Sequence, residues 1–192
     1  MLLTNSFDVA QPLDKVWAFF DDIPAVAACL PGAELTQDLG EDKYLGKVGI
    51  RMGPVRMAFD GQAAVVERDA AAHRLVLDAA GSDQKGRGNA AMVIRAQLTP
   101  TARGTTVSLE QDLQLSGAAA QFGRGMVSDV NAVIMGQFAQ NMQQRMEAAD
   151  RGEVLSAKAG QASAFSIAVQ AARMALSRVL RRFFLPFEPV PR

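Results

Sequence analysis

The sequence predicts an α+β fold in which a curved antiparallel sheet wraps around one long helix. Between Ala33 and Ser116 apolar residues alternate with polar ones, which is the period of half-buried strands. After Gly117 the apolar residues recur every three or four positions, which is the period of an amphipathic helix. One strand and two short helices are expected before the alternating region. The expected order is therefore strand, two helices, strand meander, long helix.

The N-terminal elements are marked by prolines. The first strand is expected over residues 3–9. Pro12 is expected to open a helix after it, because proline suits the first helical turn. Pro24 opens a second short helix that runs to Leu30, where Pro31-Gly32 stops it.

Six further strands are expected, joined by short connectors that are rich in turn residues. They cover Glu34–Gln37, Lys43–Met52, Val55–Glu67, Arg74–Ser82, Gly86–Leu98 and Thr105–Ser116. Short connectors favour a meander of hairpins, so about seven antiparallel strands are expected. The long helix is expected from about Ala119 to Ala149. At ~1.5 Å per residue it is long enough to cross the open face of such a sheet.

This arrangement is a helix-grip fold, and its middle strands carry unusually small inward residues. They are Gly46, Gly61, Ala63, Ala79, Gly81, Ala90 and Ala96, with methionines interspersed at 52, 57, 92, 126 and 142. A tightly packed core would place larger side chains there. We therefore expect a ligand cavity between sheet and helix. Close packing of the helix onto these small residues is the alternative.

The inward positions of the expected sheet and helices provide the candidate ligand-binding residues. They are Trp17, Phe20, Tyr44, Met57, Phe59, Gly61, Met92, Gln111, Leu113, Met126, Val130, Ile134 and Phe138. Gln111 stands out, because a buried amide needs a hydrogen-bond partner. That partner is either a neighbouring group or water, or else the carbonyl of a ligand. Tyr44 offers a hydroxyl to the same end of the cavity.

Composition excludes several classes of function. The 20 basic and 20 acidic residues give no net charge, so nucleic acid is not an expected partner. One cysteine, Cys29, and one histidine, His73, exclude a disulfide framework and a Cys/His zinc site. No constellation of catalytic residues or metal ligands is found. The N-terminus lacks the features of a signal peptide, so a cytoplasmic location is expected.

The charge is divided unevenly along the chain. Residues 1–153 carry 14 Lys/Arg and 19 Asp/Glu, whereas residues 154–192 carry six and one. We expect a grip domain over residues 1–149, a linker over 150–163 and a basic amphipathic tail over 164–192. The candidate membrane-binding residues of this tail are Phe165, Val169, Arg173, Leu176, Arg178, Leu180, Arg181, Arg182, Phe183 and Phe184. Such a helix suits an anionic membrane surface. The alternatives are that this tail helix docks on a partner protein or on the body of its own chain.

Five segments resemble the CoxG family, the G subunits of carbon monoxide dehydrogenase, which belongs to the START-like (SRPBCC) superfamily. They are VWAFFDDIP at 16–24, CLPGAEL at 29–35, YLGKV at 44–48, GPV at 53–55 and FDG at 59–61. The resemblance covers roughly residues 1–148, and its Leu-Pro-Gly motif is the most specific part. It implies a non-catalytic accessory protein of a carbon monoxide dehydrogenase-type molybdenum hydroxylase. It also implies attachment of that enzyme to the inner face of the cell membrane.

The chemistry of such an enzyme suggests the ligand. Its electrons must reach respiratory quinones, so menaquinone or ubiquinone, bound without a covalent link, is the expected occupant of the cavity. Two other functions stay open. Polyketide cyclases and aromatases share the grip fold, although they need acid–base residues that this inward register lacks. A membrane adaptor without any ligand is the other alternative.

Overall fold

The computed structural model describes residues 1–52 and 55–153, and it confirms the predicted order of elements. Strand β1 (Leu2–Val9) precedes helices α1 (Leu13–Asp21) and α2 (Ile23–Ala27). Strands β2 (Ala33–Gly40), β3 (Lys43–Met52), β4 (Val55–Asp69), β5 (Arg74–Asp83), β6 (Asn89–Thr101) and β7 (Gly104–Leu115) follow. The 3₁₀ helix η1 (Gly117–Gln121) then leads into the long helix α3 (Arg124–Asp150).

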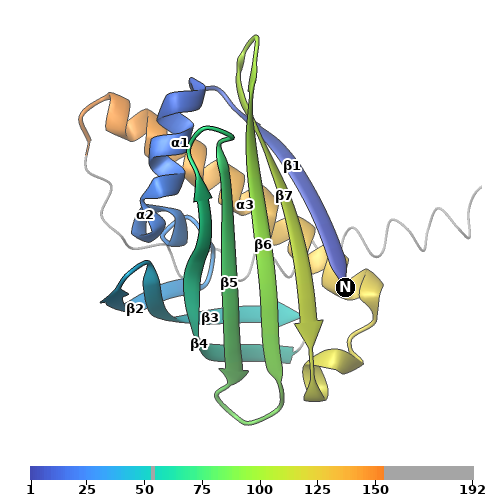
Figure 1. The fold of residues 1–192 in the computed structure, drawn as a ribbon. Helices are drawn as coiled ribbons and strands as arrows, with labels where there is room; N and C mark the ends of the chain where they lie inside the picture. Colours follow the sequence, from blue (N-terminus) through green and yellow to red (C-terminus); the bar gives the residue numbers. More distant parts are fainter. Residues whose placement is uncertain (53–54, 154–192) are drawn as a thin grey trace, which may run out of the picture.

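The strands form one antiparallel sheet in the order β1-β7-β6-β5-β4-β3-β2. Strands β2 to β7 pair as successive hairpins, and β1 pairs with β7, with Leu3 opposite Gln111. The sheet is strongly curved, so that β2 and β3 run crosswise to β5, β6 and β7 (Figure 1). Helix α3 lies along the sheet, with α1 and α2 near its C-terminal end. This is the predicted helix-grip arrangement.

Helix α3 binds the sheet through one apolar stripe. Val127, Val130, Phe138, Met142 and Met146 are all buried, and the half-buried Ile134 completes their three- and four-residue steps. The Phe138 ring packs edge-on against the rings of Phe7 and Phe20, with centroids 5.9 and 6.5 Å apart. Burial of such a side chain contributes about 1.5–3 kcal/mol, so this stripe holds β1 and α1 onto α3.

The prediction that the long helix starts at Ala119 is wrong. Ala119 lies in η1, and the backbone is extended at Phe122, with ψ 122°, before α3 begins. The cause lies at Gly117, which has φ +64° and whose added Cβ would lie 2.4 Å from the carbonyl oxygen of Arg87. The N–H of Ala118 donates to the same oxygen at 2.6 Å. This contact fixes η1 to the β5–β6 turn and separates it from α3.

Other boundaries also differ from the prediction. Helix α2 ends at Ala27 and not at Leu30, and β6 begins at Asn89 and not at Gly86. Gly86 and Gly88 have φ values of +67° and +152°, which belong to a turn and not to a strand. Three residues that were expected in the sixth strand therefore form the β5–β6 turn.

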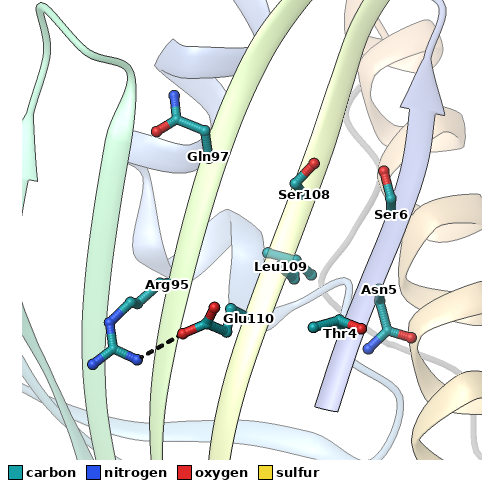
Figure 2. A pocket seen from close by; sticks show the side chains of 8 residues that line it. All are labelled: Thr4, Asn5, Ser6, Arg95, Gln97, Ser108, Leu109 and Glu110. Carbon is teal, nitrogen blue, oxygen red and sulfur yellow. Dashed lines mark hydrogen bonds and ion pairs between the residues drawn. The ribbon is translucent and has the colours of Figure 1, made fainter. Parts of the chain in front are cut away.

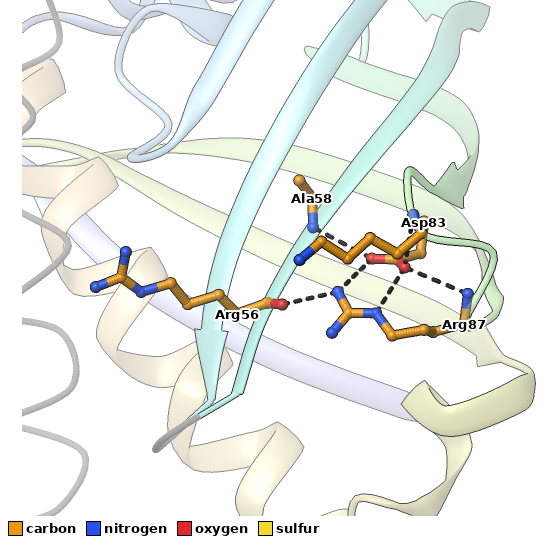
Figure 3. A network of polar contacts seen from close by, with 5 residues as sticks. Arg56, Ala58, Asp83 and Arg87 are labelled. Atoms are coloured by element: carbon orange, nitrogen blue, oxygen red, sulfur yellow. Dashed lines mark hydrogen bonds and ion pairs between the residues drawn. The ribbon is translucent and has the colours of Figure 1, made fainter.

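An ion pair stabilises this turn (Figure 3). Arg87 donates from Nε and from Nη2 to the fully buried carboxylate of Asp83, both at 2.8 Å. The backbone N–H groups of Ala58, Lys85 and Arg87 also donate to that carboxylate, and Arg87 Nη2 donates to the Arg56 carbonyl at 2.7 Å. The Arg87 guanidinium holds the pKa of Asp83 well below its ordinary value, although burial opposes this.

The predicted linker from 154 onward and the predicted tail over 164–192 lie outside the described residues. The ten candidate membrane-binding residues between Phe165 and Phe184 lie there too. Within the described part of the chain, no helix combines the length and the apolar character that a membrane crossing requires.

The Asp83 ion pair predicts a pH-dependent stability. Because the folded-state pKa of Asp83 lies below its unfolded value, its charge stabilises the fold above about pH 4 and less as the pH falls further. Asp83→Asn should therefore unfold at lower denaturant concentration than the parent at pH 7. The difference between the two should shrink below about pH 4.

Urea unfolding between pH 2.5 and 7 measures this difference. Glu110→Gln is the matched control, because Glu110 and its partner Arg95 are about half exposed, at 48% and 49%. Its effect should stay below about 1 kcal/mol. A constant difference across the pH range would mean that Asp83 acts through shape and not through its charge.

Candidate functional site

A cavity of about 380 Å³ lies between the sheet and α3. Every strand and helix of the described domain contributes to its wall, including α1 through Phe20 and η1 through Ala119. The wall is overwhelmingly apolar. Its volume lies within the range of small-molecule sites, which are enclosed, mostly apolar and equipped with few polar groups.

Short side chains on the sheet leave this volume unfilled. All seven small inward residues that the sequence singled out line the cavity. Six of them form two neighbouring rows across the strands: Ala63 lies opposite Ala79, and Gly61 lies opposite Gly81 in a row that also holds Gly46 and Ala90. Gly61 has a second reason to be small, because a Cβ there would lie 2.3 Å from the carbonyl oxygen of Ala80. Ala63 is therefore the better position at which to fill the cavity by substitution.

All but three of the candidate ligand-binding residues line the cavity. Those that line it are Phe20, Tyr44, Phe59, Gly61, Met92, Gln111, Leu113, Val130, Ile134 and Phe138. Alternation along the strands was sufficient to place most of them.

Trp17, Met57 and Met126 do not line the cavity, which corrects the prediction for these three. The buried face of α1 is formed by Val16 and Phe20, so Trp17 points elsewhere and packs edge-on against His73, with centroids 5.5 Å apart. Met57 is buried in a cluster with Phe59, Ala119 and Val130. Met126 is 46% exposed, since the neighbouring Val127 occupies the inward position of α3.

Several lining residues were missed by sequence reasoning. Asn131 and Met135 line the cavity one helical turn apart on α3, and Leu30 and Pro31 line it beyond α2. The stripe that predicted Val130 and Ile134 also predicts positions 131 and 135, so the signal was present for those two. The prediction of Leu30 requires knowledge of how the chain turns after α2.

The Leu-Pro-Gly motif fixes that turn. Gly32 has φ +80°, and its added Cβ would lie 2.3 Å from the Gly49 carbonyl oxygen. The N–H of Gly49 donates to the Gly32 carbonyl at 2.8 Å, and Asn141 Nδ2 of α3 donates to the Cys29 carbonyl at 2.8 Å. The motif is thereby held between β3 and α3. As a result, Leu30 and Pro31 become part of the cavity wall.

Among the lining residues with polar side chains, Tyr44 and Gln111 are buried and Asn131 is half-buried, whereas Glu34, Lys47 and Gln62 are exposed. Gln111 is 3% exposed, and its amide contacts Asn5 and Met135. Burial, followed by the Asp38 and Asp42 carboxylates, raises the pKa of Tyr44, which keeps its hydroxyl protonated. Tyr44 lies on β3 and Gln111 on β7, four strand positions apart in the sheet.

The remaining reactive side chains lie outside the cavity wall. Cys29 is fully buried, and burial raises the pKa of its thiol to about 11, so it is protonated at neutral pH. His73 is half-buried against Trp17 in the β4–β5 turn. Over residues 1–52 and 55–153, no three His, Cys, Asp or Glu side chains are grouped so as to hold a metal ion.

A second hollow lies on the outer surface of β1, β6 and β7 (Figure 2). Thr4, Ser6 and Ser108 line it together with the Arg95–Glu110 ion pair, whose Nη1 and Oε1 atoms are 3.2 Å apart. This hollow is open and polar. The apolar cavity on the other side of the sheet is the better candidate for a small-molecule site.

Solved structures of several bacterial proteins share this fold. A conserved protein from Geobacillus kaustophilus is 20% identical, with a TM-score of 0.70, over 78% of this chain and 97% of its own. The Zhui aromatase/cyclase from Streptomyces is 15% identical, with a TM-score of 0.57, over 80% and 99%. A protein from Thermus thermophilus is 15% identical, with a TM-score of 0.56, over 78% and 99%. At these identities the likeness shows the fold alone.

The sequence itself identifies the family. No curated protein matches the chain. The family of the carbon monoxide dehydrogenase G subunit (CoxG) matches residues 6–147, which include the Leu-Pro-Gly motif and nearly all of α3. The resemblance of the five segments is thereby confirmed: this chain belongs to the CoxG family, the G subunits of carbon monoxide dehydrogenase.

Proposed function

We propose that this chain is a non-catalytic accessory protein of a carbon monoxide dehydrogenase-type molybdenum hydroxylase. In this proposal it holds the head group of a respiratory quinone, menaquinone or ubiquinone, in its cavity. It also links the enzyme to the inner face of the cell membrane. Family membership supports the accessory role. The observation that carries the ligand part is the apolar cavity between the sheet and α3.

The cavity suits the head group of a quinone in both composition and size. A quinone ring presents apolar faces and two carbonyl oxygens, which matches an apolar wall with isolated amides at Gln111 and Asn131. If each heavy atom takes about the 30 Å³ of a water molecule, 380 Å³ holds on the order of a dozen heavy atoms. That is a substituted ring system. A long isoprenoid tail would extend out of the cavity.

A carrier of this kind would allow electrons to pass from an enzyme in the cytoplasm to quinones in the membrane. A molybdenum hydroxylase in the cytoplasm oxidises its substrate in the aqueous phase, whereas the respiratory quinones that take up its electrons are dissolved in the membrane. Exposure of a quinone to water costs about 25 cal/mol per Å² of apolar surface, so it needs an apolar container outside the bilayer. The cavity supplies such a container, and Phe20, Phe59 and Phe138 provide aromatic surface against which a ring can stack.

The basic tail supports the membrane part of the proposal from sequence alone. The sequence places four arginines, at positions 173, 178, 181 and 182, among Leu176, Leu180 and Phe183, and on a helix these arginines would flank an apolar face. Each such charge contributes about 1 kcal/mol at an anionic surface, and burial of the apolar face adds to this. Attraction and burial together would hold the protein at the membrane surface.

The ligand proposal predicts that purified full-length protein carries an apolar carbonyl compound. Organic extraction followed by mass spectrometry should detect it. Ala63→Leu should remove most of it, because the added carbons occupy the space next to Ala79. The stability of this variant should not fall. In a filled core the same change would overpack and cost about 1–3 kcal/mol.

Ala64→Leu is the matched control for that experiment. Ala64 is adjacent to Ala63, but it faces the other side of the sheet and does not line the cavity. This variant should keep the extracted compound. The ligand proposal fails if the parent yields no compound and Ala63→Leu is destabilised.

The membrane proposal is tested by flotation of full-length protein with vesicles containing anionic lipid. Replacement of the four tail arginines by Gln should weaken binding and make it less sensitive to salt, since screening acts on charge. Replacement of Leu176, Leu180 and Phe183 by Ser should abolish flotation even at low salt. If the parent does not float but binds the hydroxylase through residues 165–185, the tail is a docking peptide and the membrane part is wrong.

A further inference from the structure

The amide of Gln111 has a different partner at each end. Its Oε1 accepts a hydrogen bond from Asn5 Nδ2 at 3.3 Å, and its Nε2 donates to the Met135 sulfur at 3.5 Å. The three residues come from β7, β1 and α3. Gln111 and Met135 both line the cavity, at 3% and 8% exposure, so this short chain of contacts ends at the cavity wall.

The chemistry of Met135 determines which way the Gln111 amide faces. A thioether sulfur carries no hydrogen, so it accepts weakly and never donates. A reversed amide would place the Gln111 oxygen against this sulfur, where neither atom carries a hydrogen, and the Met135 contact would be lost. The Asn5 amide would also have to reverse to keep its hydrogen bond to Gln111. The amide nitrogen of Gln111 is therefore the end that faces α3.

One hydrogen of that nitrogen is left over. An amide nitrogen carries two hydrogens, and the Met135 sulfur receives one of them. Among residues 1–52 and 55–153 no second acceptor contacts Gln111 Nε2. Since Gln111 lines the cavity, the group that it offers to a ligand is a hydrogen-bond donor.

We infer that Gln111 makes the cavity selective for the oxidised form of a quinone over its hydroquinone, and that Asn5 is the positioning residue behind this selection. The inference rests on the proposed function. Uptake of two electrons and two protons converts the two carbonyl groups of a quinone into hydroxyl groups. A carbonyl only accepts, and it matches the free N–H of Gln111. A hydroxyl brings a proton of its own, whereas the Gln111 oxygen faces Asn5 on β1 and not the end of the amide that is directed at α3.

The size of the effect follows from the hydroxyl that is left without an acceptor in an apolar wall. An unpaired buried donor costs enough to weaken binding about tenfold. Tighter binding of the oxidised form makes the bound quinone harder to reduce. For a two-electron couple, a tenfold ratio of dissociation constants lowers the midpoint potential by about 30 mV.

Asn131 provides a matched comparison within the same cavity. It lies one helical turn before Met135, is half-buried and makes no side-chain hydrogen bond to any described residue. Its amide is free to turn either end towards a ligand. Asn131 therefore contributes to the affinity for both redox forms and does not distinguish between them.

The test uses full-length protein from which any bound compound has been removed. Calorimetry in the absence of oxygen measures its dissociation constants for ubiquinone-1 and for the corresponding hydroquinone. The parent should bind the quinone about tenfold more tightly. Gln111→Leu should lose this preference, mainly through weaker quinone binding. Asn131→Leu should weaken both forms by similar factors and keep the preference. The midpoint potential of the bound quinone should fall only where the preference is seen.

Asn5→Asp is the most discriminating variant, because it should change which redox form is preferred. A carboxylate only accepts, so it should draw the Gln111 nitrogen towards β1 and turn the Gln111 oxygen to the cavity. The preference should then move towards the hydroquinone. Equal binding of both forms by the parent, or an unchanged ratio in both Gln111→Leu and Asn5→Asp, overturns the inference and leaves the proposed function standing. If the folded parent protein binds neither redox form, both this inference and the proposed ligand function are wrong.

Discussion

The rows of glycine and alanine on β3 to β6 are the feature on which the rest of the structure depends. A curved sheet and a helix can close onto each other only if side chains fill the space between them, and packing to native density normally ensures this. Here Ala63 and Ala79 provide no such filling. The stripe from Val127 to Met146 still attaches α3 to the rest of the domain. The helix is therefore held at a distance, and a cavity is left along its stretch from Val127 to Phe138.

A cavity of this kind is stable only if its ends are closed by other means. At one end the Leu-Pro-Gly motif is tied to β3 through Gly32 and to α3 through Asn141. At the other end Gly117 packs on the turn that Asp83 and Arg87 hold, which places η1 with Ala119 in the wall. Both closures use backbone contacts that only glycine permits. Polar contacts at the rim thus replace the apolar contacts that the interior lacks.

The fold and most of the cavity wall follow from sequence periodicity, because alternation assigns each strand residue to one face. Periodicity fails where a position depends on rotation about a helix axis or on the path of a loop. Trp17 and Met126 are one residue away from the inward positions Val16 and Val127, and a difference of one residue rotates a side chain by about 100°. The break before α3 depends on a contact between Gly117 and Arg87, which are far apart in sequence.

The position of Gln111 shows how a polar group is tolerated in such a cavity. Burial of an amide without partners costs more than an apolar residue would, so its oxygen is satisfied by Asn5 from the edge strand. Within the described part of the chain, the only contact of its nitrogen is the weak acceptor Met135. An apolar neighbour would have left the orientation of the amide undetermined. Met135 accepts one of the two hydrogens of the nitrogen, so the Gln111 amide is both fixed in direction and still able to donate the other.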